Sequence, residues 1–318
     1  MGRRIAVMLQ TSATLQSVGA VDLDPKIVGQ NLAQVLDVAS PQLEKVVISQ
    51  AVSKTKAKVA IHATRSWLGE IEDQLAMLLN KGLNVVSTAE ELVFPIAENK
   101  KIIQRLDKIA KRKKVCLIGV GVNPGFVLDL LPATVGRVVH NVKNVKALRV
   151  VDLRKRRLPL QQKVGLALSP AEFAEKIKDK TFGHQGMRES LHLLAAGLGV
   201  DIKRTYTAIK PIISDIICET RYFRITPGVT RGIYQEAVGY VGEHGQIRLE
   251  LKMIVGSEKP SAENICESFD EIEIEGTPSI HLKIPGGIFG EDATAAAVLN
   301  VIPKMLAVAP GYRTVLEV

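Results

Sequence analysis

The chain has 318 residues, of which 46% are hydrophobic and 24% charged, a composition typical of globular proteins. The length favours two domains, and no apolar run approaches the roughly 18 residues that a membrane-spanning helix needs. The apolar stretch from Ile5 to Leu9 is too short for a signal peptide. We therefore expect a cytoplasmic protein with no membrane partner.

The net charge of +9 raises the question of nucleic-acid binding. Much of the excess lies in two local runs, residues 108–114 and 154–157, and the first is typical of the solvated end of a helix. Aromatic residues make up only 4% and do not alternate with the basic ones, so we expect no nucleic-acid partner. Cys116, Cys218 and Cys266 are widely separated, which predicts neither a disulfide framework nor a metal site.

Helical and strand patterns alternate in the first half of the chain. The patterns predict helices at residues 3–12, 70–80 and 97–114, and strands at 15–22, 58–64, 83–88 and 115–121. Apolar strands separated by helices are typical of a parallel sheet covered on both faces. The fold class is therefore α/β, with a Rossmann-type domain at residues 1–138.

The second half of the chain has a different sequence pattern. Ser169 to Glu172 has the pattern of a capping box, and several β-rich segments follow between residues 204 and 284. The alternation from Arg248 to Met253 predicts a sheet with one wet face. We expect an α+β domain with a mixed or antiparallel sheet at residues 139–290, then a C-terminal helix and tail at 291–318.

The N-terminal segment has the spacing of a dinucleotide-binding unit. Gly2 opens a helix and Asp22 ends the next strand, which matches the interval between the third glycine of G-x-G-x-x-G and the acid that binds the adenosine ribose. We therefore assign Gly2, Arg3 and Asp22 to an NAD site. The alternative is a chance glycine and an ordinary turn acid at Asp22.

The first strand and the other two glycines of such a unit are absent before Gly2. Either the start codon is miscalled or the chain has decayed or been repurposed. In the usual strand order the absent strand is central, so we expect a Rossmann sheet that is divided into two halves.

Three predicted strand ends lie at the same edge of the sheet, where such folds bind ligands. We assign Thr64, Thr88, Asn123 and Pro124 from these ends to the cofactor site. The Asn123–Pro124 turn would expose backbone N–H groups at the start of a helix. Glu90 and Glu91 follow Thr88, and either carboxylate is a catalytic candidate or fills the first turn of the next helix.

Five runs in the same order resemble the 2,4-diaminopentanoate dehydrogenase family, which includes native amine dehydrogenases and is related to dihydrodipicolinate reductases. The runs are residues 87–92, 121–127, 149–159, 183–186 and 284–290. The resemblance implies NAD(P)-dependent oxidative deamination of an amine or amino acid to a ketone and ammonia, reversible as reductive amination. It also implies a homodimer, a substrate pocket in the second domain, a last helix that returns to the first domain, and an acid among Glu90 and Glu91 that holds the reacting nitrogen.

Four further residues are candidates for substrate binding: Arg65, Arg156, Arg157 and His184. Arg65 stands where a small hydroxyl residue is expected, and it would narrow the pocket or attract an acidic substrate. Arg156 or Arg157 would meet a substrate carboxylate, although such basic runs are more often solvated, and His184 would line the pocket or serve as a structural histidine. Asp22 would repel a 2′-phosphate, which predicts NAD over NADP.

Two other functions stay open. A cyclic-imine reductase of the dihydrodipicolinate type would share this fold, but the basic His/Lys motif of that branch is not found here. A catalytically silent nucleotide-binding protein is the second alternative, because the phosphate loop is incomplete. Formation of NADH with a panel of amines separates an enzyme from a silent binder.

Overall fold

The computed structural model describes residues 1–52, 56–179, 182–256 and 267–318. The chain forms two compact units, one of residues 1–121 with 290–318, the other of residues 122–289. The segment from Gly290 thus belongs to the first unit. The first unit ends well before the expected boundary at 138, because the segment after Gly121 is bonded to the second unit through Asp129, which accepts a hydrogen bond from Ser190.

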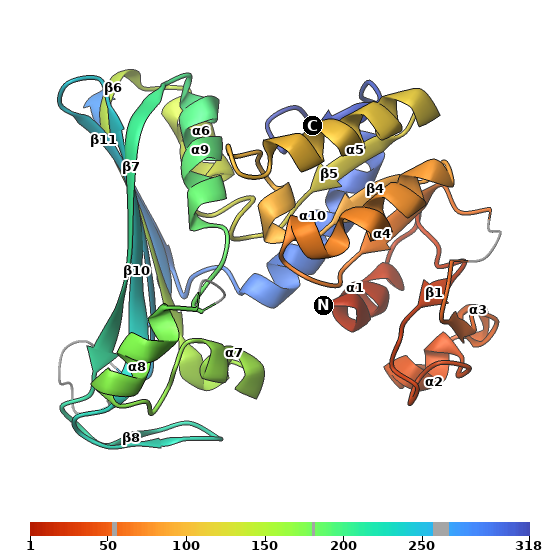
Figure 1. The fold of residues 1–318 in the computed structure, drawn as a ribbon, viewed down its shortest axis with the longest axis horizontal. Helices are drawn as coiled ribbons and strands as arrows, with labels where there is room; N and C mark the ends of the chain where they lie inside the picture. Colours follow the sequence, from red (N-terminus) through yellow and green to blue (C-terminus); the bar gives the residue numbers. More distant parts are fainter. Residues whose placement is uncertain (53–55, 180–181, 257–266) are drawn as a thin grey trace. The chain divides into compact units, whose positions relative to one another are not determined.

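The first unit is an α/β structure with every strand pair parallel. In chain order its elements are α1 (Gly2–Leu9), β1 (Ala20–Val21), α2 (Leu32–Leu36), α3 (Pro41–Glu44), β2 (Ile48–Ser49), β3 (Val59–His62), α4 (Leu68–Asn80), β4 (Asn84–Ser87), the 3₁₀ turn η1 (Glu90–Leu92), α5 (Lys100–Lys113), β5 (Cys116–Gly119), α10 (Gly290–Met305) and β14 (Gly311–Arg313). Figure 1 shows α4 and α5 beside strands β4 and β5.

The parallel strands of this unit form two separate sheets. One has the order β1-β2 and the other β14-β5-β4-β3. In the Rossmann order the first strand would lie between β1 and β3, and among the described residues no strand takes that place. The prediction of a Rossmann-like sheet in two halves is therefore confirmed. The predicted strand at 15–22 is reduced to two residues because only Ala20 and Val21 pair with β2.

The second unit is built on a six-stranded mixed sheet. Its elements are α6 (Leu130–Gly136), β6 (His140–Asp152), the 3₁₀ turn η2 (Leu153–Lys155), α7 (Leu158–Lys163), α8 (Pro170–Ile177), α9 (Met187–Leu198), β7 (Ile202–Ile213), β8 (Cys218–Glu219), β9 (Arg224–Ile225), β10 (Thr230–Val241), β11 (Gly245–Ile254), β12 (Phe269–Thr277) and β13 (Ile280–Pro285). The order is β13-β12-β6-β11-β10-β7, and only β6 and β11 are parallel.

This sheet has one buried face, as the sequence pattern predicts. In β11, Leu249, Leu251 and Met253 are buried, and the intervening Arg248 and Glu250 are partly exposed. Figure 1 shows the sheet almost edge-on, with α6 and α9 on one side of it. The predicted capping box is also confirmed, because the Ser169 hydroxyl accepts from the Glu172 amide and the Glu172 carboxylate accepts from the Ser169 amide.

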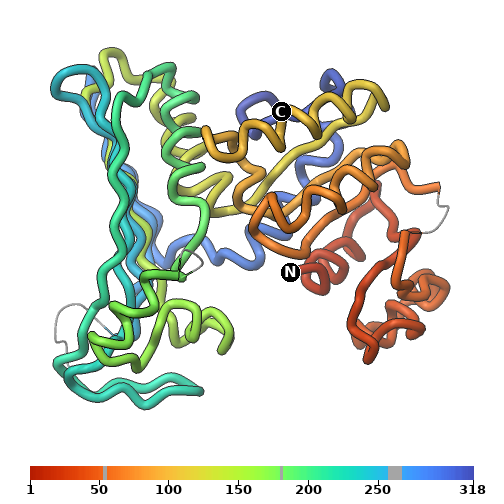
Figure 2. Tube along the Cα trace, viewed as in Figure 1, coloured from red at the N-terminus to blue at the C-terminus, as the bar shows by residue number. Residues whose placement is uncertain are grey.

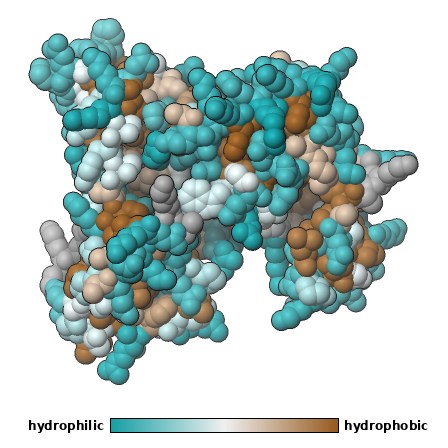
Figure 3. All heavy atoms as spheres, viewed as in Figure 1, coloured by the Kyte–Doolittle hydropathy of each residue, from teal (hydrophilic) through white to brown (hydrophobic). Residues whose placement is uncertain are grey.

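The structure places the cysteines and the first basic run in different parts of the fold. Cys116 and Cys218 are buried free thiols, and Cys266 lies outside the described residues. The basic run at 108–114 forms the exposed last turn of α5, whose path Figure 2 traces. No described helix is both long and apolar enough to span a membrane, and the face in Figure 3 is largely hydrophilic with small hydrophobic patches.

Candidate active site

In the first unit, a hydrogen-bond network joins the carboxyl ends of β3 and β4. The buried His62 imidazole contacts the Ser87 hydroxyl at 3.0 Å through Nδ1, and Gln74 and Thr64 at 3.0 and 2.9 Å through Nε2. Ser87 also accepts from the Ala89 amide at 3.2 Å. Burial lowers the pKa of His62, so the ring is neutral. The network fixes the backbone immediately before Glu90.

Glu90 and Glu91 have different surroundings. The Glu91 carboxylate accepts from the Leu68 amide at 2.7 Å, and Leu68 is the first residue of α4. Glu91 therefore caps that helix, where a negative charge is favoured. Burial raises the pKa of Glu91, and the bond from Leu68 opposes this shift. Both residues lie in the 3₁₀ turn rather than in the first turn of α5, which starts only at Lys100.

The other predicted cofactor residues of this unit are placed as follows. Gly2 and Arg3 begin α1, where the first backbone N–H groups have no partner within the helix. A Cβ on Gly2 would meet no atom within 4 Å, so the start of α1 is open to a ligand. Asp22 follows β1, is exposed, and accepts a hydrogen bond from the Asp24 amide. A helix start open to phosphate and a carboxylate next to the β1 end fit a dinucleotide.

Three predicted residues have local roles in the structure. The Thr64 hydroxyl belongs to the His62 network and lies 3.2 Å from Gln74. Arg65 is exposed and forms an ion pair with Glu70 in the first turn of α4, at 3.1 Å. Thr88 pairs through its amide with the His62 carbonyl.

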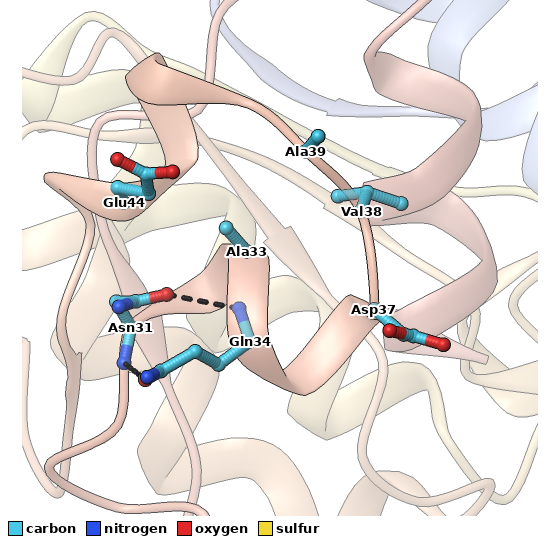
Figure 4. Close-up of a pocket in the computed structure, with 7 residues that line it drawn as sticks. All are labelled: Asn31, Ala33, Gln34, Asp37, Val38, Ala39 and Glu44. Atoms are coloured by element: carbon cyan, nitrogen blue, oxygen red, sulfur yellow. Dashed lines mark hydrogen bonds between the residues drawn. The ribbon is translucent and has the colours of Figure 1, made fainter.

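A depression of the first unit lies elsewhere. It has a volume of about 410 Å³ and lies between α2 and α3 (Figure 4). Its lining residues are Asn31, Ala33, Gln34, Asp37, Val38, Ala39 and Glu44. None of the residues predicted for the cofactor or for catalysis lines it, so we assign no function to it.

Asn123 and Pro124 follow the end of β5 and belong to the second unit. The reason is a set of bonds within that unit. The His184 Nε2 atom lies 3.0 Å from the Asn123 carbonyl, and the His184 backbone exchanges two hydrogen bonds with the Gln235 side chain. Burial, followed by the nearby Lys163, lowers the pKa of His184 to about 4. His184 is therefore a neutral donor that holds the Asn123 turn.

Asp129 anchors the same turn from its other end. Its Oδ2 atom accepts from the Gly125 amide at 2.8 Å and from the Ser190 hydroxyl of α9 at 2.6 Å. Burial raises the pKa of this carboxyl to about 6. Sequence reasoning missed Asp129, because an acid after an apolar run reads as an ordinary helix start.

The raised pKa of Asp129 predicts how the stability of the second unit varies with pH. A carboxyl with a higher pKa in the folded state favours folding when protonated, and this contribution is lost as the pH rises from about 4 through 6. A shift of about two units corresponds to about 3 kcal/mol. We expect the free energy of unfolding of the native chain, measured by urea denaturation, to fall between pH 4 and pH 7. The fall should be about 3 kcal/mol larger than the fall measured for Asp129→Asn over the same pH range. Parallel pH curves for the two proteins would contradict this assignment.

A buried ion pair was also missed. Arg149 of β6 and Asp270 of β12 are 4% and 1% exposed, and their charged groups lie 3.5 Å apart. Both hold Ile288: Arg149 donates to its carbonyl, and Asp270 accepts from its amide at 2.7 Å. A charged residue within the apolar run 147–151 is the signal that points to Arg149. Because isolated buried charges are costly, such a residue implies a partner.

The basic run at 154–157 divides into different roles. The Arg156 guanidinium stacks over the Phe289 ring at 4.4 Å. Arg154 forms a bidentate ion pair with Asp152. Arg157 is exposed and precedes α7. The structure therefore brings Arg156 to the segment that the Arg149–Asp270 pair holds.

Comparison with known proteins identifies relatives of this chain. Residues 126–318 match the family described as the 2,4-diaminopentanoate dehydrogenase C-terminal domain. The 2,4-diaminopentanoate dehydrogenase of Acetoanaerobium sticklandii is 25% identical over 326 aligned residues, which cover 100% of this chain and 90% of that protein.

Solved structures show the same fold. An amine dehydrogenase from Mycobacterium smegmatis matches with a TM-score of 0.84 at 24% identity, covering 100% of this chain and 92% of that one. A scyllo-inositol dehydrogenase from Lactobacillus casei with bound NAD(H) matches with a TM-score of 0.55 at 13% identity, covering 96% and 85%. Because the family match extends over more than half of the chain, this protein belongs to the 2,4-diaminopentanoate dehydrogenase family.

Proposed function

We propose that this protein is an NAD-dependent dehydrogenase that converts an amine, related to 2,4-diaminopentanoate, to a ketone and ammonia. The observation that carries the proposal is the Glu90–Glu91 pair after β4: Glu91 is engaged by the Leu68 amide, which leaves the Glu90 carboxylate for a substrate. Membership in the family supplies the reaction class. The same groups would serve reductive amination in reverse.

Glu90 has two tasks in this proposal. Its negative charge stabilises the substrate nitrogen as a cation, and its oxygen atoms take or return the proton of that nitrogen. A bound nicotinamide would supply the hydride acceptor. The chain's own contribution is to hold Glu90 in one place, which the His62–Ser87–Ala89 network supports. Thr64 and Thr88, at the same strand ends, are the proposed neighbours of the cofactor.

The substrate proposed here carries a carboxylate. Arg149 and Arg156 both lie near Asp270, and both affect the pKa of its carboxyl group. The buried Arg149 Nη1 atom lies 3.5 Å from the Asp270 carboxylate and makes no other polar contact among the described residues. We propose that Arg156, as expected from the sequence, meets an anionic group on the substrate. We therefore propose an amino acid rather than a simple alkylamine.

We propose NAD as the preferred cofactor. Asp22 is exposed after β1, and its carboxylate would repel a 2′-phosphate while accepting hydrogen bonds from a ribose. The Lys26 side chain is the nearest cation in sequence, and its backbone amide is bound to Asp24. Gly2 and Arg3 would hold the phosphates at the start of α1.

The test is the formation of NADH or NADPH by the full chain with paired substrates, amino acids and the matching amines without a carboxylate. We expect turnover with NAD, at least tenfold higher kcat/KM than with NADP, and preference for the amino acid of each pair. A panel that yields no reduced cofactor, while NADH fluorescence titration still shows binding, would identify a silent nucleotide-binding protein instead. Reduction of a cyclic imine without amine oxidation would identify the reductase alternative.

A further inference from the structure

The 3₁₀ turn η1, which carries Glu90, rests directly on the backbone of β5. A Cβ atom on Gly119 would lie 2.5 Å from the Leu92 carbonyl carbon and 2.7 Å from the Val93 nitrogen. No real side chain tolerates such contacts, so a residue larger than glycine would displace the turn. Glycine at position 119 is therefore required for the observed position of the turn that carries Glu90.

Tyr312 holds the same turn from β14. Its hydroxyl group donates to the Leu92 carbonyl at 2.9 Å and lies 3.3 Å from the Val93 carbonyl. The chain at Tyr312 is itself fixed, since β14 pairs in parallel with β5 and the Tyr312 amide donates to Asp107 at 2.9 Å. Burial raises the pKa of Tyr312, so the hydroxyl remains a donor at all working pH values.

A short turn of this kind needs such support. A 3₁₀ segment of three residues has few bonds of its own. Here the Leu92 amide donates to the Ala89 carbonyl and the Val93 amide to the Glu90 carbonyl. Glu91 ties one side of the turn to α4, and Tyr312 ties its end to the C-terminal strand. Glu90 directly precedes these two attachment points in the sequence, and on its other side the Ala89 amide donates to Ser87.

We propose that Tyr312 is a positioning residue for amine oxidation, which fixes the turn Glu90–Leu92 and thereby the Glu90 carboxylate. The inference rests on the proposed function of Glu90. It assigns a role in the reaction to the C-terminal segment, more than 200 residues away in sequence from the acid that it supports. Displacement of a reacting group by a fraction of an ångström is enough to lower the rate.

The test is Tyr312→Phe in the full chain, which removes one oxygen atom and keeps the ring in the core. We expect kcat for deamination to fall about tenfold, equivalent to about 1.4 kcal/mol of barrier, with little change in the KM for NAD and a drop of only a few degrees in Tm. Tyr206→Phe, at an exposed tyrosine of the second unit, is the matched control and should leave kcat unchanged.

A double-mutant cycle with Glu90→Gln separates positioning from a general structural effect. If Tyr312 acts through Glu90, Tyr312→Phe should have little further effect on kcat once the charge at position 90 is gone. An equal loss in both backgrounds, or full kcat in Tyr312→Phe alone, would overturn the proposal and leave the function of Glu90 intact. Full activity of Glu90→Gln alone would instead refute the catalytic assignment of Glu90, and this proposal with it.

Discussion

Glu90→Gln is expected to lower kcat for deamination by about 100-fold, whereas Glu91→Gln should change kcat by less than about threefold. A glutamine keeps the shape of the side chain and removes the negative charge that stabilises a cationic nitrogen in the transition state. At position 91 the glutamine oxygen can still accept from the Leu68 amide, so the turn is retained. The measurement is steady-state kinetics of both variants with the best amine substrate.

Stability distinguishes the two variants as well. Glu91→Gln removes a charge at the start of α4, which should cost about 0.5–1 kcal/mol of unfolding free energy. Within the described part of the chain the Glu90 side chain makes no hydrogen bond that holds the fold, so the Tm of Glu90→Gln should stay close to that of the native chain. The reverse pattern in kcat, with Glu91→Gln inactive and Glu90→Gln active, would exchange the two roles. Near-full activity of both variants would place the reacting acid elsewhere.

Much of the first unit could be predicted because its strands and helices carry strong local patterns. Helix α5 is amphipathic over Lys100–Lys113, and β5 is a short apolar run with every residue buried. The Gly2-to-Asp22 interval predicted the divided sheet, since only the order of a helix and a strand was needed. Elements that depend on distant partners gave no such signal. The three residues of β14 are a strand because they pair with β5.

The candidate site could be predicted only in part, for a related reason. Glu90 and Glu91 stand out as two acids after an apolar strand. The sequence around these two acids does not show that one of them binds the Leu68 amide, because that contact joins positions 23 residues apart. Asn123 looks like another strand-end residue, but its carbonyl bonds to His184, which lies 61 residues further along the chain. Long-range hydrogen bonds decided both assignments.

The Arg149–Asp270 pair is the buried polar feature with the largest expected effect on stability. Asp270→Asn should lower the unfolding free energy of the second unit by about 3–5 kcal/mol, because it leaves the Arg149 charge buried without a partner. Asparagine still accepts from the Ile288 amide through its oxygen, so the loss is chiefly one of charge. For a unit of this size we expect Tm to fall by roughly 6–20 °C.

The effect should also be local. Both charged side chains bond to Ile288, next to Phe289, on which Arg156 stacks. In Asp270→Asn, amide hydrogen exchange of residues 284–289 should therefore become faster by more than tenfold relative to the native chain. Glu175→Gln, which breaks the exposed pair with Lys178, is the matched control and should cost less than about 1 kcal/mol.

A second substitution tests whether charge is the cause. Arg149→Met combined with Asp270→Asn removes both charges, and the double variant should be more stable than Asp270→Asn alone. The proposed carboxylate site loses its buried guanidinium in this variant, so the preference for an amino acid over the matching amine should weaken even where stability is regained. The Asp270→Asn variant could instead unfold at the same temperature as the native chain, with unchanged amide hydrogen exchange at residues 284–289. That result would show that the ion pair does not hold this segment.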